Sequence, residues 1–219
     1  MENVAVLVDG GFYLRRAKHL WGERSAQESA EELHTYCIKH TWNKRPPNDR
    51  LYRIFYYDCP PSRQRIHNPY TKTTIDLSKT DLFTWMSVFH EELRTKRKVA
   101  LRLGELSPVG SGYMLKPDAI RDLMNGTIEI SEIKEEHFSL HVEQKGVDMR
   151  IGLDISSMAY KRQVTKIVLI AGDSDFVPAA KLARREGVDF VLDPMGAKIK
   201  PSLSEHIDGI RSHNITPDH

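Results

Sequence analysis

The chain has 219 residues, of which 40% are hydrophobic and 28% charged, which is typical of one globular domain with a buried core. Its formal net charge of +2 excludes a strong overall basic field for nucleic acid, although a local basic patch would fit. Cys37 and Cys59 lack zinc-type spacing and predict free thiols in a reducing compartment. There is neither a signal-peptide pattern nor an apolar run long enough to span a membrane. We therefore expect a cytoplasmic protein with no membrane partner.

Apolar strands and amphipathic helices alternate through the first half of the chain. We expect strands at 3–8, 50–57 and 98–106, and helices at 12–20, 26–40 and 79–95. The motif Ser25-Ala26-Gln27-Glu28 predicts a capping box at the start of the second helix. The polar, basic segment 62–74 predicts a loop.

Periodicity weakens over 106–143, which we interpret as an insertion in the same domain, with a short helix at 118–124 and a strand at 138–142. The regular pattern then returns. We expect a helix from Val147 to about Arg162, a strand at 165–171, a helix at 174–186 and a strand at 188–192. This alternation predicts an α/β fold: a Rossmann-like three-layer sandwich with a mostly parallel central sheet of about five strands. A single domain would cover residues 1–219.

Aspartates follow two of the apolar strands. Asp9 comes after 4–8, while Asp173 and Asp175 come after 167–171 in the string VLIAGDSDF. The carboxyl ends of parallel strands are where open α/β sheets bind ligands, so neighbouring strands would bring these carboxylates together. Such a cluster needs a cation, and oxygen ligands without Cys or His favour Mg²⁺ or Mn²⁺. Because Mg²⁺ commonly binds phosphates as well, the pattern favours phosphodiester chemistry.

Two further aspartates belong to the region of the helix that follows 106–143, one at its start and one inside it. Asp148 belongs with the strand-end acids, or it simply caps the helix, and the same alternative applies to Asp173 and Asp175. Asp9 has no such structural role unless the following glycine turn uses it. Asp154 lies farther along the helix, where we expect it to support the other acids or to pair with Lys145 or Arg150.

Three segments carry a family resemblance: VAVLVDGGFYL, QKGVDMRIGLDISSMAY and KIVLIAGDSDFVPAAKLARREGVDFVL. Together they resemble the NYN domain family of PIN-like nucleases, in particular its bacterial LabA-like branch. The tail at 201–208 resembles the closing helix of that family, whereas 60–80 and 106–143 match no family motif.

The resemblance implies a PIN-like fold and an Mg²⁺- or Mn²⁺-dependent ribonuclease, with an endoribonuclease favoured, that hydrolyses RNA phosphodiesters with metal-activated water. It implies metal ligands at Asp9, Asp148, Asp173 and Asp175, with Asp154 as a further catalytic acid. One or two ions fit this set. The expected partner is single-stranded or structured RNA, with DNA left open, and a homodimer is compatible with the family although no pattern locates an interface.

The chain departs from the family because many relatives carry an asparagine shortly after the first aspartate, where this chain reads Gly10-Gly11-Phe12-Tyr13. Ser174 or the amides of the two glycines are candidates for its role. Basic side chains suit phosphate contacts, although exposed basic residues are also common on surfaces without any function. The expected substrate-binding residues are Gly10, Gly11, Arg15, Arg63, Arg65, His67, Lys145 and Ser174.

Two other functions are considered. A haloacid-dehalogenase-like phosphatase also has an aspartate after its first strand, but it needs a second acid where this chain has Gly11. A catalytically weak or inactive RNA-binding or regulatory module is supported by the missing asparagine and opposed by the intact acids.

Overall fold

The computed structural model describes residues 1–43 and 47–213, whose central feature is a six-stranded sheet. Its strand order is β10-β9-β8-β1-β2-β5, and every pairing is parallel. The strands are β1 (Asn3–Asp9), β2 (Arg50–Asp58), β5 (Val99–Leu103), β8 (Lys166–Ile170), β9 (Asp189–Asp193) and β10 (Gly209–Ile210). The expected α/β sandwich is confirmed, and the strand of this central sheet that the sequence did not predict is the two-residue β10.

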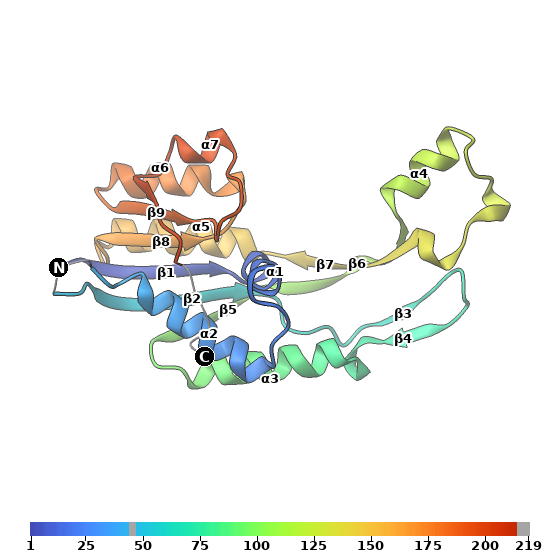
Figure 1. Ribbon diagram of the computed structural model, residues 1–219, viewed down its shortest axis with the longest axis horizontal. Coiled ribbons are helices and arrows are strands. Elements are labelled where there is room, and N and C mark those ends of the chain that lie inside the picture. Colours follow the sequence, from blue (N-terminus) through green and yellow to red (C-terminus); the bar gives the residue numbers. More distant parts are fainter. Residues whose placement is uncertain (44–46, 214–219) are drawn as a thin grey trace.

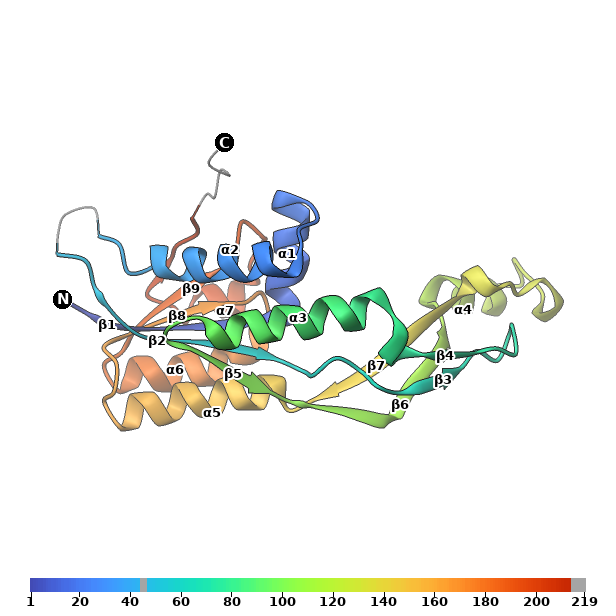
Figure 2. The ribbon, with the colours of Figure 1, turned by 90° about the horizontal axis from the view of Figure 1, so that it is seen from below.

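Helices cover both faces of the sheet and form the outer layers (Figures 1 and 2). They are α1 (Gly10–Trp21), α2 (Ala26–Lys39), α3 (Asp81–Thr95), α5 (Val147–Tyr160), α6 (Val177–Arg185) and α7 (Pro201–Ser204). The described residues also contain the 3₁₀ turns η1 (Leu77–Lys79), η2 (Ile130–Glu132), η3 (Glu135–His137) and η4 (Ser174–Phe176). No helix in the described ranges is long and apolar enough to cross a membrane. The predicted closing helix at 201–208 is wrong in length, because α7 ends at Ser204.

The alternating side chains of β1 show why its sequence is apolar throughout. Val4, Val6 and Val8 belong to the core under α1, α2 and α3, whereas Ala5 and Leu7 belong to the core under α5 and α6. A strand with helices on both faces cannot place polar side chains on either one. The first polar residue, Asp9, therefore stands at the strand's carboxyl end.

The capping box predicted for α2 is confirmed. The Ser25 hydroxyl accepts a hydrogen bond from the Glu28 amide at 3.2 Å, and the Glu28 carboxylate accepts one from the Ser25 amide at 2.9 Å. Both donors belong to the set that a helix start leaves unpaired, so this local sequence fixes where α2 begins.

Two antiparallel hairpins extend beyond the carboxyl edge of the sheet (Figure 1). One pairs β3 (Arg65–His67) with β4 (Thr74–Asp76). The other pairs β6 (Glu105–Leu115) with β7 (Phe138–Lys145), and α4 (Pro117–Met124) lies between its strands. We call residues 105–145 the arm.

These hairpins correct two predictions. The segment 62–74 contains β3 and the first residue of β4 and is therefore not simply a loop. The strand predicted at 98–106 is two strands, divided at Gly104, where a Cβ atom would lie 2.5 Å from the Lys145 carbonyl oxygen. The predicted helix at 118–124 and strand at 138–142 are present, and the strand continues to Lys145.

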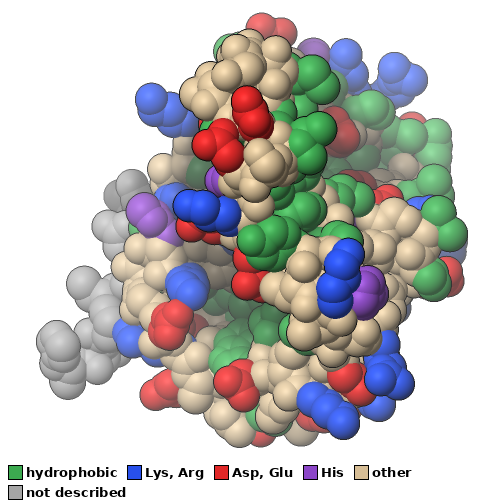
Figure 3. All heavy atoms as spheres, turned by 90° about the vertical axis from the view of Figure 1, so that its right-hand side faces the viewer, with side chains coloured by type: hydrophobic (Ala, Val, Ile, Leu, Met, Phe, Trp, Pro, Cys, Tyr) green, Lys and Arg blue, Asp and Glu red, His purple; other side chains and the backbone are tan. Residues whose placement is uncertain are grey.

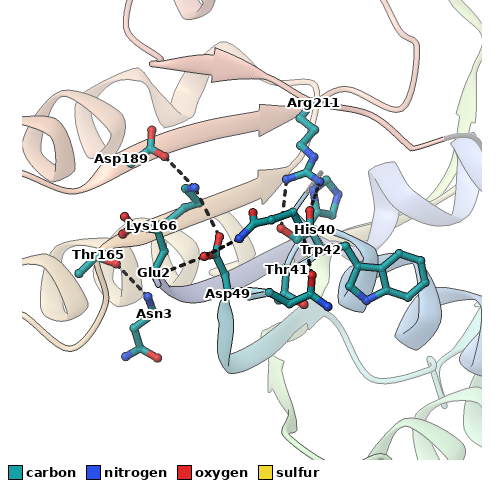
Figure 4. A network of polar contacts seen from close by, with 12 residues as sticks. Glu2, Asn3, His40, Thr41, Trp42, Asp49, Thr165, Lys166, Asp189 and Arg211 are labelled. Carbon is teal, nitrogen blue, oxygen red and sulfur yellow. Dashed lines mark hydrogen bonds and ion pairs between the residues drawn. The ribbon is translucent and has the colours of Figure 1, made fainter. Parts of the chain in front are cut away.

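Ion pairs join the strands at the opposite edge of the sheet (Figure 4). The Asp49 carboxylate accepts a hydrogen bond from the Glu2 amide at 3.0 Å, and Lys166 Nζ lies 3.8 Å from it. The same ammonium lies 3.2 Å from the Asp189 carboxylate. This edge is closed by charge pairing, whereas unpaired carboxylates gather at the carboxyl edge.

Candidate active site

The strands that precede the two acidic motifs are direct neighbours. β1 pairs with β8, so Asp9 and Asp173 emerge at the same edge, as the sequence predicted. A cavity of about 380 Å³ opens there and is lined by Asp9, Asp58, Asp148 and Asp173 together with Gly11, Arg15, Tyr57, Gln144, Gly146, Val147 and Met149. We call it the acidic cavity. Seen from the side of the arm, the surface is hollowed, and hydrophobic and acidic side chains lie next to one another in the hollow (Figure 3).

Asp9 is fixed in place by the helix that follows it. Its carboxylate caps α1 by accepting a hydrogen bond from the Phe12 amide at 3.0 Å. Asp9 therefore has a structural role as the N-cap of α1, which the sequence did not predict. Burial raises the pKa of Asp9, the Phe12 hydrogen bond opposes this shift, and the nearby charge of Asp148 adds to it. The Phe12 amide orients the carboxylate, while burial makes the environment unfavourable for its charge.

Asp148, unlike Asp9, caps no helix. It lies in the first turn of α5, but the cap position is Gly146 in a left-handed conformation with φ 80°, and no side chain caps the helix. The helix-cap alternative for Asp148 is therefore wrong. Partial burial raises its pKa, and the charges of Asp173 and Asp175 raise it further. Its carboxylate is directed to the cavity without the capping duty that holds Asp9.

Asp173 and Asp175 differ from each other in position. The Asp173 carboxylate caps η4 by accepting a hydrogen bond from the Asp175 amide at 3.2 Å, and it also lines the acidic cavity. Asp175 is not among the lining residues, although its charge acts on Asp148. The Ser174 hydroxyl lies 3.3 Å from Lys200 Nζ and accepts its hydrogen bond.

Asp154 lies outside the acidic cavity. Its carboxylate accepts hydrogen bonds from Tyr57 Oη at 2.8 Å and from Arg102 Nε at 3.0 Å. The predicted pairing with Lys145 or Arg150 is thus replaced by Arg102 of β5. These hydrogen bonds join α5 to β2 and to the outermost strand β5, so we assign Asp154 a structural role.

Asp58 is a cavity residue that sequence reasoning missed. It follows Tyr57, the register partner of Asp9, at the end of β2, and only 6% of it is exposed. Its carboxylate accepts hydrogen bonds from Tyr56 Oη at 3.0 Å and from the Cys59 amide at 2.7 Å. The signal was available, because Asp58 follows an apolar strand just as Asp9 does.

Asp193 ends β9 in the same way but does not reach the cavity. It is fully buried, and its carboxylate accepts hydrogen bonds from Tyr36 Oη, Met195 N and Ser212 Oγ at 2.5, 2.8 and 2.6 Å. His40 Nε2 lies 2.9 Å from it. This aspartate joins α2 to the C-terminal segment.

The two glycines after Asp9 have different surroundings. A Cβ atom on Gly10 would lie 2.5 Å from Tyr56 Oη and 2.7 Å from the Tyr57 carbonyl oxygen. Gly10 is therefore required for packing α1 against β2, which argues against its predicted contact with substrate. Gly11 lines the acidic cavity, and a Cβ atom there would meet only Arg15 and Asp9, at 3.5 and 3.6 Å.

Basic side chains lie beside the carboxylates, although not all of those predicted. Arg15 lines the acidic cavity and also a neighbouring one of about 290 Å³, which shares Asp9 and Asp173. That second cavity is also lined by Lys198 and Lys200, which no sequence motif marked as substrate contacts. Their positions depend on the loop after β9, which local sequence does not place.

The remaining predicted substrate contacts are farther from the acids. Arg65 and His67 are exposed on β3 and do not line the acidic cavity, and Lys145 is absent from its lining although Gln144 and Gly146 belong to it. The Arg63 guanidinium lies over the Phe83 ring, 5.0 Å from its centroid.

The donor set limits how a metal could bind. Within residues 1–43 and 47–213, no three His, Cys, Asp or Glu side chains are grouped closely enough to hold a metal ion between them. The expected four-ligand cluster is therefore not preformed. Mg²⁺ commonly uses one or two carboxylates together with waters and phosphate oxygens, and the acidic cavity provides donors for that mode.

Fold and site together define an α/β sandwich with a carboxylate-lined cavity at the carboxyl edge of its parallel sheet. The NYN domain family model matches residues 115–207, less than half of the chain. This match supports the resemblance to the NYN family and includes Asp148, Asp154, Asp173 and Asp175. Asp9 and Asp58 lie outside the matched range.

Among solved structures, the chain is similar to a protein of unknown function from Vibrio parahaemolyticus. The two are 15% identical, the TM-score is 0.48, and the alignment covers 95% of this chain and 91% of the other. None of the curated protein sequences matches the chain.

Proposed function

We propose that this protein is a PIN-like endoribonuclease of the NYN family, in its LabA-like branch, which acts in the cytoplasm with Mg²⁺ or Mn²⁺. The observation that carries the proposal is the convergence of Asp9, Asp148 and Asp173 on one cavity with Arg15 beside them. These four residues come from β1, the start of α5, the segment after β8 and α1, so only a specific fold brings them together.

A divalent ion would be held by one or two of these carboxylates, with water and phosphate oxygens completing its shell. When bound, it would neutralise phosphate charge and acidify a bound water. Burial, with a smaller contribution from neighbouring acids, raises the pKa of Asp9 and of Asp148, so the charged carboxylates are disfavoured and a bound cation would offset that cost.

The protein's own groups would share the remaining tasks. Arg15, Lys198 and Lys200 offer positive charge for the phosphate, whose oxygens would otherwise be repelled by the acids. Asp148 has a raised pKa and no capping bond, which suits it to accept a proton from the attacking water. The water oxygen bonds to phosphorus, one ester P–O bond breaks, and the departing oxygen takes up a proton.

The test compares labelled single-stranded RNA, structured RNA and DNA in Mg²⁺, Mn²⁺ or EDTA. We expect RNA cleavage that EDTA abolishes, with losses of about a hundredfold or more in Asp9→Asn and Asp173→Asn. Asp189→Asn is the matched control, since it removes a carboxylate from the other edge of the sheet. Cleavage that survives EDTA, or full activity in both site variants, would contradict the proposal.

A second candidate is an RNA-binding module without catalysis. It is favoured by the lack of a three-ligand group among the described residues. In such a module the acids only repel phosphate, so Asp173→Asn should tighten RNA binding while no variant or metal supports cleavage.

A further inference from the structure

An apolar cavity of about 430 Å³ lies beside the acidic cavity, between α3 and the base of the arm. Its volume falls in the range of small-ligand pockets, about 300–1,000 Å³. Its apolar wall includes Leu77, Phe83, Met86, Leu106, Leu140 and Val142. Phosphodiester hydrolysis by itself needs no apolar cavity, so this one calls for an occupant of its own.

The two cavities share a boundary. Gly11, Asp58 and Gln144 line both of them. Every phosphate of an RNA strand is joined through ribose to a base, so a phosphate in the acidic cavity brings a base to this boundary. The neighbouring space is apolar, which suits the face of a base that has left its stack.

Phe83 offers a surface on which such a base can stack. Its half-buried ring lines the apolar cavity, and the Arg63 guanidinium lies over the ring, 5.0 Å from its centroid. An aromatic ring combined with an arginine is typical of single-strand binding sites, where bases stack and the charge attracts the backbone.

Asp58 gives the apolar cavity a buried polar group. Its carboxylate accepts one hydrogen bond from Tyr56 Oη and one from the Cys59 amide, and His90 Nε2 lies 3.7 Å away, beyond hydrogen-bond distance, whereas a carboxylate can accept about four hydrogen bonds. The unused capacity favours a ligand with N–H donors. Guanine presents two adjacent donors on its Watson–Crick edge, whereas adenine and cytosine each place a ring nitrogen lone pair beside their amino group.

We propose that the apolar cavity binds an unstacked nucleobase beside the scissile phosphate, guanine in preference, with Phe83 as the stacking surface and Asp58 as the acceptor. The proposal rests on the ribonuclease function proposed above. It gives that nuclease a base preference next to the cleavage point.

The experiment measures Kd by fluorescence anisotropy, with the Asp173→Asn protein as background so that RNA stays intact. The probes are short oligouridine strands with one central guanosine, inosine, adenosine or abasic residue. We expect the guanosine strand to bind about tenfold more tightly than the abasic strand, with inosine between them because it lacks the amino group. Phe83→Ala should remove most of this difference, and Trp42→Ala, which truncates an exposed aromatic at the other edge of the sheet, should preserve it.

Equal Kd values for guanosine and abasic strands would overturn the proposal, as would a guanosine advantage that survives Phe83→Ala. Sedimentation velocity tests a competing occupant: dimers lost in Phe83→Ala, with RNA binding unchanged, would assign the cavity to a second copy of the chain. Cleavage of the same strands by the wild-type protein separates the two proposals. Base-dependent binding without metal-dependent cleavage rejects only the ribonuclease, whereas equal binding and cleavage of all strands rejects only the base site.

Discussion

The carboxylate of Asp9 accepts a hydrogen bond from the backbone amide of Phe12 at 3.0 Å, so a candidate catalytic acid is also the N-cap of α1. The same carboxylate therefore stabilises α1 and, under the proposed function, would also take part in the chemistry. A substitution at this position affects both unless the replacement retains the cap.

Asparagine and alanine at position 9 should separate the two roles. Asparagine is a good N-cap and also removes the charge, so Asp9→Asn should abolish cleavage with little loss of stability. Asp9→Ala should abolish cleavage and also lower the free energy of unfolding by about 1 kcal/mol. Urea denaturation of both variants gives the comparison, and equal stability of the two would show that the cap contributes little.

Asp148→Asn should raise the melting temperature in EDTA at neutral pH. The folded-state pKa of Asp148 is raised above its ordinary value of 3.8, so its charged form is disfavoured in the folded protein. Stability therefore falls as pH rises through the raised pKa, and the asparagine variant escapes this loss. The higher melting temperature of the asparagine variant should disappear once the pH is below 3.8, because the wild-type carboxyl is then neutral in both the folded and the unfolded chain.

Asp118→Asn is the control for this comparison, because Asp118 is an exposed first-turn acid of α4 outside the acidic cavity. It should not gain stability. A lower melting temperature for Asp148→Asn would mean that the attraction of its charge to the helix dipole outweighs repulsion within the cavity.

Alanine at the two glycines after Asp9 should have opposite effects on stability. Gly10→Ala places a methyl group against Tyr56 and the Tyr57 carbonyl, and overpacking of this kind costs about 1–3 kcal/mol. Gly11→Ala makes only ordinary contacts at 3.5 and 3.6 Å and should leave stability unchanged or raise it by up to about 1 kcal/mol. Equal destabilisation in urea would contradict the assignment of Gly10 to packing and Gly11 to the cavity.

Acid should destabilise the protein through His213. Burial, reinforced by the electrostatic effects of His40 and Arg211, lowers the pKa of His213 from 6.5 to about 4. Between these values the unfolded chain binds a proton that the folded chain does not, so stability falls as pH decreases through this window. Thermal unfolding followed by circular dichroism should show this fall in the wild type and a smaller one in His213→Gln, and identical slopes would rule out His213 as the source.

Several features of the fold could be predicted from local sequence. The apolar run of β1 specified a strand buried on both faces, and Ser25 with Glu28 specified the start of α2. The 62–74 segment could not be predicted in this way, because the short strands β3 and β4 are defined by pairing with each other rather than by an apolar pattern.

The aspartates show where local sequence stops being sufficient. The neighbouring strands β9, β8, β1 and β2 end in or are followed by Asp193, Asp173, Asp9 and Asp58, which is the same pattern four times. Sequence determined that acids would gather at this edge of the sheet. Local sequence could not determine which of these acids face a cavity. A carboxylate that is buried instead needs hydrogen-bond partners to offset the loss of water, and those partners are not its neighbours in the sequence.

Those partners come from distant parts of the chain. Tyr36 and His40, which precede Asp193 by 157 and 153 residues, bind its carboxylate and remove it from the site. The N-cap position of α5 is occupied by Gly146, so the Asp148 carboxylate makes no capping hydrogen bond. The sequence determined the sheet and the acids at its edge, and only the tertiary structure decided which acids remain available for chemistry, since hydrogen bonds across the fold satisfy some of them and not others.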